Sequence, residues 1–221
     1  FHIAGHRISL MWGIHLVHHH SEEFNLSVNF ALSPLGFILR SFMYCSLVVL
    51  GLPVEYVILS SYLNAFYQYY LHTQFINTIP YLEKVFVMPA HHQVHHGSNE
   101  LYLDKNFGGV FILWDKLFRT YQPLVEPVKY GLTAALPHKD FINLQMFFFK
   151  KLLANFKAMG FKDGIRLLFV GPEHQSSEVP SVLPLKTNTS KTKLIIGILI
   201  YVLAYQTLIQ IENLGWFIIV F

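Results

Sequence analysis

Residues 92–96 read His92-Gln-Val-His95-His96 and repeat the spacing of His15-Leu-Val-His18-His19 at residues 15–19. On an α-helix, with about 100° between successive residues, the three histidines of each box lie on one face. A single histidine in an apolar stretch is usually held by a hydrogen bond, but two boxes of identical spacing are hard to explain in that way. The spacing indicates two short helical segments that direct their imidazoles at a shared site.

Another box, His2-Ile-Ala-Gly-His6, is the first along the chain and places two more imidazoles one helical turn apart. His6 and His15 are nine residues apart, which puts them about half a turn out of phase on a straight helix. The chain must therefore break or turn between these boxes, and we expect the break near Trp12-Gly13. His20 follows the box at 15–19 but points about 100° away from its nearest member, so it is not expected to be a ligand.

The eight histidines of the three boxes predict a metal site. Neutral imidazole is the commonest metal ligand in proteins, and eight such rings are costly to bury without a metal or a dense hydrogen-bond network. His72 is a ninth candidate because it lies at the end of a long apolar stretch. Nine histidines suffice for two metal ions. Imidazole suits zinc, copper, nickel and iron alike, so the spacing alone does not choose the metal.

Besides His20, three histidines remain outside this set of nine. His91 lies one helical turn before His95 and could replace His92 as the inward-facing residue. His138 and His174 have no partners nearby in the sequence, and we expect both at the surface.

The composition indicates a membrane protein and excludes several other classes. Hydrophobic residues make up 53% of the 221 residues and charged residues only 13%, against about 25% charged residues in a typical soluble domain. The net charge of +3 is too small to indicate a nucleic-acid partner. Cys45 is the only cysteine, which excludes an intrachain disulfide framework and a cysteine-based zinc site.

Residues 29–82 form the longest apolar stretch and carry two formal charges, Arg40 and Glu55. As continuous helix these 54 residues would extend about 81 Å, and one crossing of a bilayer needs about 30 Å. The stretch therefore predicts a membrane hairpin of two crossings, broken near Gly51-Leu52-Pro53. Shallow re-entrant helices remain an alternative, because the two charges shorten each uncharged run.

The C-terminal half predicts three further features. Residues 143–161 alternate apolar and lysine residues, as in a helix that lies either at the bilayer interface or on the protein's own core. Residues 171–190 are rich in Pro, Ser and Thr and predict a linker. Residues 194–211 carry no charge and predict a transmembrane helix, with the lysines before it on the cytosolic side.

Together these segments predict an all-α, polytopic membrane protein whose transmembrane helical bundle is capped by a cytosolic, histidine-rich metal site. The expected parts are a histidine-box core at 1–125, a cytosolic or interfacial segment and linker at 126–190, and a C-terminal transmembrane region at 191–221. The first residue is not Met and the last residues are apolar, so we expect the chain to be an internal piece of a longer protein.

Two stretches carry a resemblance to a known superfamily. The run from Trp12 to Asn25, which ends in Ser21-Glu-Glu-Phe-Asn25, resembles the second histidine box of the fatty acid hydroxylase and sterol desaturase superfamily. The run from His92 through Asp104-Lys-Asn-Phe-Gly-Gly109 to Phe118 resembles the third box. Leu71-His72-Thr73 and Lys129-Tyr-Gly-Leu-Thr133 resemble, within the superfamily, the branch that cleaves glyceryl ethers.

The resemblance implies a pair of metals, usually iron with zinc possible, on the cytosolic side of the endoplasmic reticulum membrane. It implies that the ligands are the nine histidines, namely His2, His6, His15, His18, His19, His72, His92, His95 and His96. It also implies an O2-dependent monooxygenase that hydroxylates the carbon next to the ether oxygen of a membrane lipid, with tetrahydrobiopterin as electron donor. Five polar residues are candidates to hydrogen-bond the ligands, or else serve as caps and turns: Glu22, Glu23, Asn25, Asp104 and Asn106.

Two other functions stay open from the sequence. A sterol desaturase, a C-4 methyl oxidase or a fatty acid 2-hydroxylase of the same superfamily would take electrons from cytochrome b5. A histidine-rich metal transporter is an alternative of another class, and it would be expected to carry acidic residues within the apolar stretch, where Glu55 stands alone.

Overall fold

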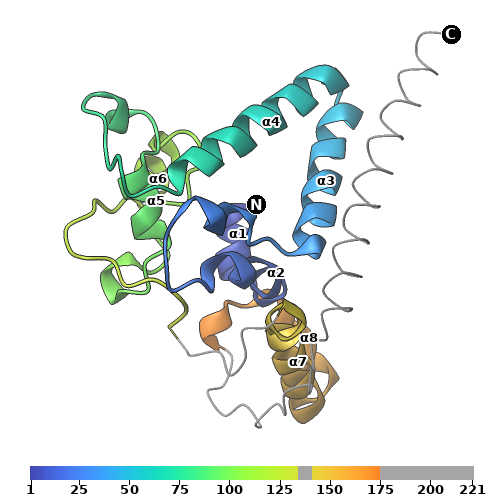
Figure 1. Ribbon diagram of the computed structural model, residues 1–221. Helices are drawn as coiled ribbons and strands as arrows, with labels where there is room; N and C mark the ends of the chain where they lie inside the picture. Colours follow the sequence, from blue (N-terminus) through green and yellow to red (C-terminus); the bar gives the residue numbers. More distant parts are fainter. Residues whose placement is uncertain (134–140, 175–221) are drawn as a thin grey trace, which may run out of the picture. The chain divides into compact units, whose positions relative to one another are not determined.

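The computed structural model describes residues 1–133 and 141–174, and within them the regular elements are helices (Figure 1). No β-strand forms in these residues beyond two isolated bridges, which pair Phe86 with Phe111 and Gly97 with Tyr130. The all-α prediction is confirmed for this part of the chain. By its internal contacts the chain divides into two units, 1–183 and 184–221, and the second lies outside the described residues.

The first two helices carry the first two histidine boxes. α1 spans His2–Arg7 and α2 spans Ser9–His19. The predicted break between them exists, but it falls at Ile8 and not near Trp12-Gly13. Ile8 adopts an extended conformation (φ −121°, ψ 117°), and the Ser9 N–H donates to the carbonyl of Val170 instead of continuing the first helix.

Gly13 lies inside α2 and serves packing. A Cβ atom there would lie 3.0 Å from the ring of Phe149 and 3.2 Å from that of Phe148, so glycine allows the close approach of α7.

The apolar stretch at 29–82 forms two long helices. After the short 3-10 helix η1 (Leu26–Phe30), α3 spans Pro34–Val49 and α4 spans Val54–Leu71 (Figure 1). The chain turns between them at residues 50–53, where Gly51 has a φ of +96° and Pro53 precedes α4, so the predicted position of the break is confirmed. Among the described residues, no helix combines the length and the apolar character needed to cross a membrane.

The third histidine box lies on a short helix within irregular segments. η2 (Leu82–Lys84) leads to α5, which spans Pro89–His95, and η3 (Glu100–Tyr102) and α6 (Leu113–Phe118) follow. The loop between η3 and α6 has left-handed backbone at Asp104 and Asn106, with φ of 56° and 52°. These two residue types tolerate that region better than most, so the loop can bend sharply back toward the box.

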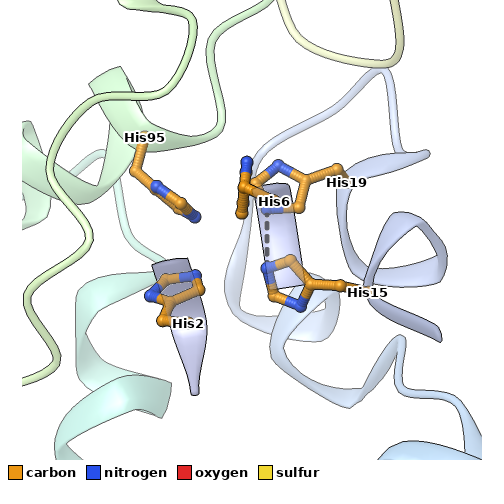
Figure 2. Close-up of side chains that lie close together, drawn as sticks. All are labelled: His2, His6, His15, His19 and His95. Carbon is orange, nitrogen blue, oxygen red and sulfur yellow. Dashed lines mark hydrogen bonds between the residues drawn. The ribbon is translucent and has the colours of Figure 1, made fainter. Parts of the chain in front are cut away.

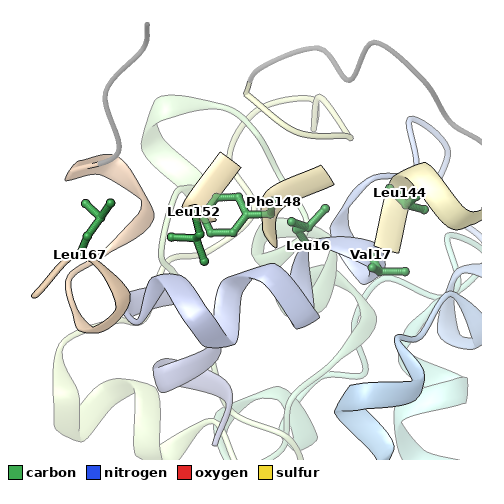
Figure 3. Packing of buried hydrophobic residues seen from close by; sticks show 6 residues of the cluster. All are labelled: Leu16, Val17, Leu144, Phe148, Leu152 and Leu167. Carbon is green, nitrogen blue, oxygen red and sulfur yellow. The ribbon is translucent and has the colours of Figure 1, made fainter. Parts of the chain in front are cut away.

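The largest apolar cluster joins α2 to two later helices, α7 (Phe141–Met159) and α8 (Phe161–Phe169). Leu16 and Val17 of α2 lie in one cluster with Leu144, Phe148 and Leu152 of α7 and with Leu167 of α8 (Figure 3). The helix expected at 143–161 therefore packs its apolar face on the protein's own core. This packing holds the side of α2 that lies opposite its histidines.

Several expectations for the C-terminal part lie outside the described residues. These are the transmembrane helix at 194–211, the linker from residue 175 onward, and the surface position of His138. η4 (Pro172–His174) occupies the first residues of the expected linker.

Candidate metal centre

Five histidines from three helices gather into one group. Their imidazoles face a common space between α1, α2 and α5 (Figure 2). One ring nitrogen of each lies within 4.8 Å of the corresponding nitrogen of every other member, and two of these atoms, the Nε2 atoms of His15 and His19, are 3.1 Å apart. The members of this five-histidine group are His2, His6, His15, His19 and His95.

Four further histidines form a second group with the same 4.8 Å limit between ligand atoms. The Nε2 atom of His72 lies 3.2 Å from that of His18 and 3.1 Å from that of His92, and the Nε2 atoms of His96 and His18 are 3.1 Å apart. All four side chains are buried. This four-histidine group combines α2, the end of α4 and the third box.

The two groups are neighbours. His19 of the first stacks on His96 of the second, with ring centroids 4.4 Å apart and an interplanar angle of 21°. The structure thus brings together all nine histidines named from the sequence. Within the box at 92–96, His92 and not His91 faces the groups, since the Nδ1 atom of His91 accepts a hydrogen bond from the Met88 N–H. His20 stands apart, with its Nδ1 atom donating to the Val17 carbonyl at 2.6 Å.

One loop, residues 104–107, orients three rings of the five-histidine group. The Nδ1 atom of His2 donates to the Phe107 carbonyl at 2.8 Å, and that of His95 donates to the Lys105 carbonyl at 2.9 Å. The Nδ1 atom of His6 lies 3.3 Å from a carboxylate oxygen of Asp104. A carbonyl oxygen can only accept, so Nδ1 of His2 and His95 carries the hydrogen and Nε2 keeps its lone pair.

Hydrogen bonds made by the side chains of Asp115 and Asn106 fix the conformation of this loop. The buried carboxylate of Asp115 accepts from the N–H groups of Phe107 and Gly108 at 2.6 and 2.8 Å and from the Thr120 hydroxyl at 2.7 Å. The buried amide of Asn106 donates to the carbonyls of His91 and Gln122. The loop that orients the rings is therefore fixed by internal hydrogen bonds.

A main-chain carbonyl also orients a ring of the four-histidine group. The Nδ1 atom of His72 donates to the Gln68 carbonyl at 2.7 Å, which again leaves Nε2 free of hydrogen. The ring of Phe24 stacks on His72 and, on its other side, on Tyr130, with centroids 5.5 and 5.1 Å apart. The aromatic ring thus closes one side of the group.

Both groups fit metal ions. In the five-histidine group, the buried Nε2 atoms of His6 and His95 have no hydrogen-bond partner among the residues that the structure describes, and a buried ring nitrogen left unpaired is costly unless a ligand satisfies it. The 3.1–3.2 Å separations between Nε2 atoms are close to the roughly 3.3 Å between two nitrogens of a tetrahedral site with metal–nitrogen bonds of about 2.0–2.1 Å. An all-imidazole donor set suits iron, zinc or copper.

A family model described as fatty acid hydroxylase matches residues 1–120, which include every histidine of both groups. The chain belongs to the fatty acid hydroxylase family. The family model matches more than half of the chain, so the superfamily assignment made from the boxes is confirmed.

Curated relatives of this fatty acid hydroxylase family member extend the likeness beyond residue 120. Alkylglycerol monooxygenase from Homo sapiens is 36% identical over 173 residues, which cover 78% of this chain and 39% of the relative. The enzyme of the same name from Xenopus tropicalis is 33% identical over 175 residues, again 78% of this chain and 39% of the relative. The chain thus spans about two fifths of the length of these relatives. No solved structure gives a significant match.

Two of the five polar residues proposed beside the histidines of this family member support those histidines. Asp104 contacts a ligand ring, and Asn106 acts through the backbone of the box helix. The Asn25 side chain caps η1 by accepting from the Ser27 N–H, and the Glu23 N–H donates to the Ser21 hydroxyl oxygen, so both residues belong to a turn. Glu22 packs beside Gly131: a Cβ atom added at Gly131 would lie 3.2 Å from the Cγ atom of Glu22.

The sequence reasoning missed the orienting carbonyls of Gln68, Lys105 and Phe107 and the role of Asp115. A main-chain carbonyl leaves no mark in the side-chain sequence. The run of Asp104, Asn106 and two glycines does indicate a sharply bent loop, and from it the carbonyls beside the histidines could have been expected.

Burial sets the charge of the rings. It lowers the pKa of His2 from 6.5 to about 3, and it lowers the pKa values of other members well below 6.5, namely His15, His18, His19, His92, His95 and His96. Burial also lowers the pKa of His6, although Asp104 opposes this effect. At neutral pH the rings are uncharged and offer lone pairs to a metal.

We expect acid to destabilise the metal-free protein. For His2, the folded-state pKa of about 3 lies below the unfolded value of 6.5, so the unfolded chain binds more protons between these values and stability falls as pH falls from about 6.5 toward 3. The slope should be at least about 1.4 kcal/mol per pH unit, the value for one such group. Urea unfolding of metal-stripped, full-length protein between pH 7.5 and 5 measures it. A flat profile would show that the rings are not buried as neutral groups.

We expect His19→Ala to lose metal and His20→Ala to keep it. The two residues are adjacent, but only the ring of His19 belongs to the five-histidine group, while His20 bonds to the Val17 carbonyl. Elemental analysis of the two purified variants, prepared together, makes the comparison. Metal loss from His20→Ala alone would mean that the second box does not continue as the regular helix α2.

Proposed function

We propose that this chain is the catalytic part of an O2-dependent, di-iron lipid monooxygenase that hydroxylates the carbon beside the ether oxygen of an alkylglycerol. The observation that carries the proposal is the convergence of nine histidines, in two adjacent groups, within the segment that matches the fatty acid hydroxylase family. Relatives named alkylglycerol monooxygenase, at 31–36% identity, support the ether-lipid substrate.

Different residues of the chain would bind the metals, orient the imidazoles and exclude water in this reaction. The nine imidazoles hold the ions, and the loop at 104–107 keeps the rings of His2, His6 and His95 in orientation. When bound, a pair of redox-active metals supplies the activation of O2. Phe107 packs against rings of the five-histidine group and Phe24 against rings of the four-histidine group. Both limit the access of water.

The overall reaction balances with tetrahydrobiopterin as the donor. One oxygen atom of O2 enters the C–H bond next to the ether oxygen, and the other is reduced to water by two electrons and two protons from the pterin. The resulting hemiacetal then breaks its carbon–oxygen bond, which gives a fatty aldehyde and a glycerol derivative. The assignment of the pterin rests on the likeness to the glyceryl-ether branch.

The substrate's route supports a membrane location, which we propose as the endoplasmic reticulum with the metal groups facing the cytosol. α3 and α4 expose large apolar side chains, such as Phe42 at 76%, Val49 at 87% and Phe66 at 73%. Exposed apolar surface of this extent favours contact with a lipid phase. Since α3 contacts α2 and α4 ends at Leu71, directly before His72, lipid that contacts these helices lies close to both metal groups.

The deciding experiment is oxidation of 1-O-hexadecylglycerol by membranes that contain the full-length protein. We expect hexadecanal to form with added tetrahydrobiopterin and not with cytochrome b5 and its reductase. Turnover of a sterol or fatty acyl substrate with cytochrome b5, and none of the ether with pterin, would replace this proposal by the sterol or fatty acyl one. Membership of the fatty acid hydroxylase family favours either enzyme over a metal transporter.

A further inference from the structure

A cavity opens between α1, α2 and the start of α3 and reaches both metal groups. His15 of the five-histidine group and His18 of the four-histidine group line it side by side. Its volume of about 70 Å³ is several times the roughly 10–15 Å³ that one water molecule needs. Most of the other lining residues are apolar, among them Phe1, Ile14 and Phe37. The polar side chains that interrupt this lining, other than the two histidines, are Ser33 and Arg40.

Ser33 is one of the residues that line this cavity, and its hydroxyl is buried and unused. It is the residue at the N-cap of α3, where a serine normally accepts a hydrogen bond from a backbone N–H of the first turn. Here its side chain makes no such bond, although its backbone carbonyl accepts from Gly36 and Phe37. Only 5% of Ser33 is exposed, and its Oγ atom has no hydrogen-bond partner within residues 1–133 and 141–174. A buried hydroxyl without a partner costs stability, which points to a ligand that supplies the missing bond.

Arg40 adds an unpaired positive charge to the same cavity. Its guanidinium lies over the ring of Phe1, 5.7 Å from the centroid, and no ion pair joins it to a carboxylate in the part of the chain that the structure describes. The neighbouring imidazoles are neutral and two metal ions would add further positive charge. An anion beside Arg40 would therefore be favoured.

We propose that Ser33 and Arg40 form the subsite that holds the phosphate of a lipid head group beside the metal centre, with the apolar walls in contact with the adjoining carbon chain. The inference rests on the proposed function for the identity of the lipid, and it extends that function to a preference for ether lipids that carry a phosphate over neutral alkylglycerols. Arg40 supplies charge-assisted hydrogen bonds and Ser33 a single neutral one.

Binding and turnover are measured separately on the full-length protein in nanodiscs. The two probes are 1-O-hexadecylglycerol and its 3-phosphate, and without a reductant neither can turn over, so the dissociation constant is obtained directly. Arg40→Gln should weaken binding of the phosphate lipid about tenfold or more and leave binding of the neutral lipid nearly unchanged. Arg40→Lys should restore part of the difference. With pterin present, the loss should appear in KM rather than in kcat.

Ser33→Ala separates a binding role from a structural one. Because the hydroxyl bonds to none of the described residues, the variant should melt at or above the temperature of the wild type while binding the phosphate lipid more weakly. Matched controls are Ser46→Ala, whose hydroxyl bonds to the Met43 carbonyl within α3, and Arg166→Gln on the exposed side of α8. Both should bind the two lipids as the wild type does.

The outcomes distinguish this subsite from the proposed function. Selective binding of the phosphate lipid that depends on Arg40, without oxidation of either ether, would leave the subsite standing and overturn the proposed function. Oxidation of the ethers with equal binding of both lipids by wild type and Arg40→Gln would overturn the subsite alone. Free inorganic phosphate should not compete at millimolar concentration, and full competition would show an anion site without a lipid role.

Discussion

His95→Ala is expected to abolish turnover and to lower the metal content of the protein. The buried Nε2 atom of His95 has no hydrogen-bond partner in the described part of the chain. Its ring lies 4.3 Å from that of His2 and 4.8 Å from those of His6 and His19, measured between centroids. Loss of a residue that merely orients a ligand typically costs 10–100-fold in metal affinity or activity, so loss of the ligand should cost more than about a hundredfold. Oxidation of the ether lipid and elemental analysis measure the two effects.

The matched variant for the other group is His18→Ala, which should remove metal from the four-histidine group. Both variants should remain in the membrane fraction, because the backbone hydrogen bonds of the apolar helices are satisfied within each helix and do not depend on a metal. A His95→Ala protein with full metal content and normal turnover would exclude His95 as a ligand.

Asp115→Ala should destabilise the protein and loosen the five-histidine group, although Asp115 touches no histidine of that group. Its carboxylate accepts three hydrogen bonds from buried groups, and the same loop presents the carbonyl of Phe107 to His2 and that of Lys105 to His95. Three donors would be left without a partner, at about 1–3 kcal/mol for each. We therefore expect a loss of at least about 3 kcal/mol in the free energy of unfolding, together with weaker metal binding.

Asp115→Asn provides the graded comparison, because the amide keeps the shape and one acceptor oxygen. It should lie between the wild type and Asp115→Ala in both unfolding midpoint and metal affinity. Asp163→Ala, in the exposed first turn of α8, is the control and should change neither by much. Equal stability of Asp115→Ala and Asp163→Ala would contradict the role given to this loop.

The spacing within each box predicted that its imidazoles share one helix face, while His72 was a candidate because it ends the apolar stretch. His72 lies 20 residues before His92, yet its ring nitrogen comes within 3.1 Å of that residue. The apolar stretch predicted a hairpin and its turn, since Gly51 and Pro53 interrupt any helix. The need for a break between His6 and His15 followed from their separation of nine residues, which places them about half a turn apart on a straight helix.

The position of that break could not be predicted, because it depends on a contact far away in the chain. The Ser9 N–H bonds to the carbonyl of Val170, more than 150 residues later, while Gly13 turned out to face the rings of α7. The same limit applies to the carbonyls that orient the imidazoles. Whether residues 143–161 pack on lipid or on protein was equally open, because an amphipathic pattern shows that one face is buried but not what covers it.

The most direct test of the central claim, a histidine-only centre for two metals, is the metal content and ligand environment of the full-length protein. Elemental analysis combined with X-ray absorption spectroscopy should give two iron ions per chain, or two zinc ions, with a nitrogen-dominated ligand shell and the outer-shell scattering typical of imidazole. A freshly prepared, unchelated protein with no bound metal, or with one ion held by oxygen or sulfur ligands, would contradict it.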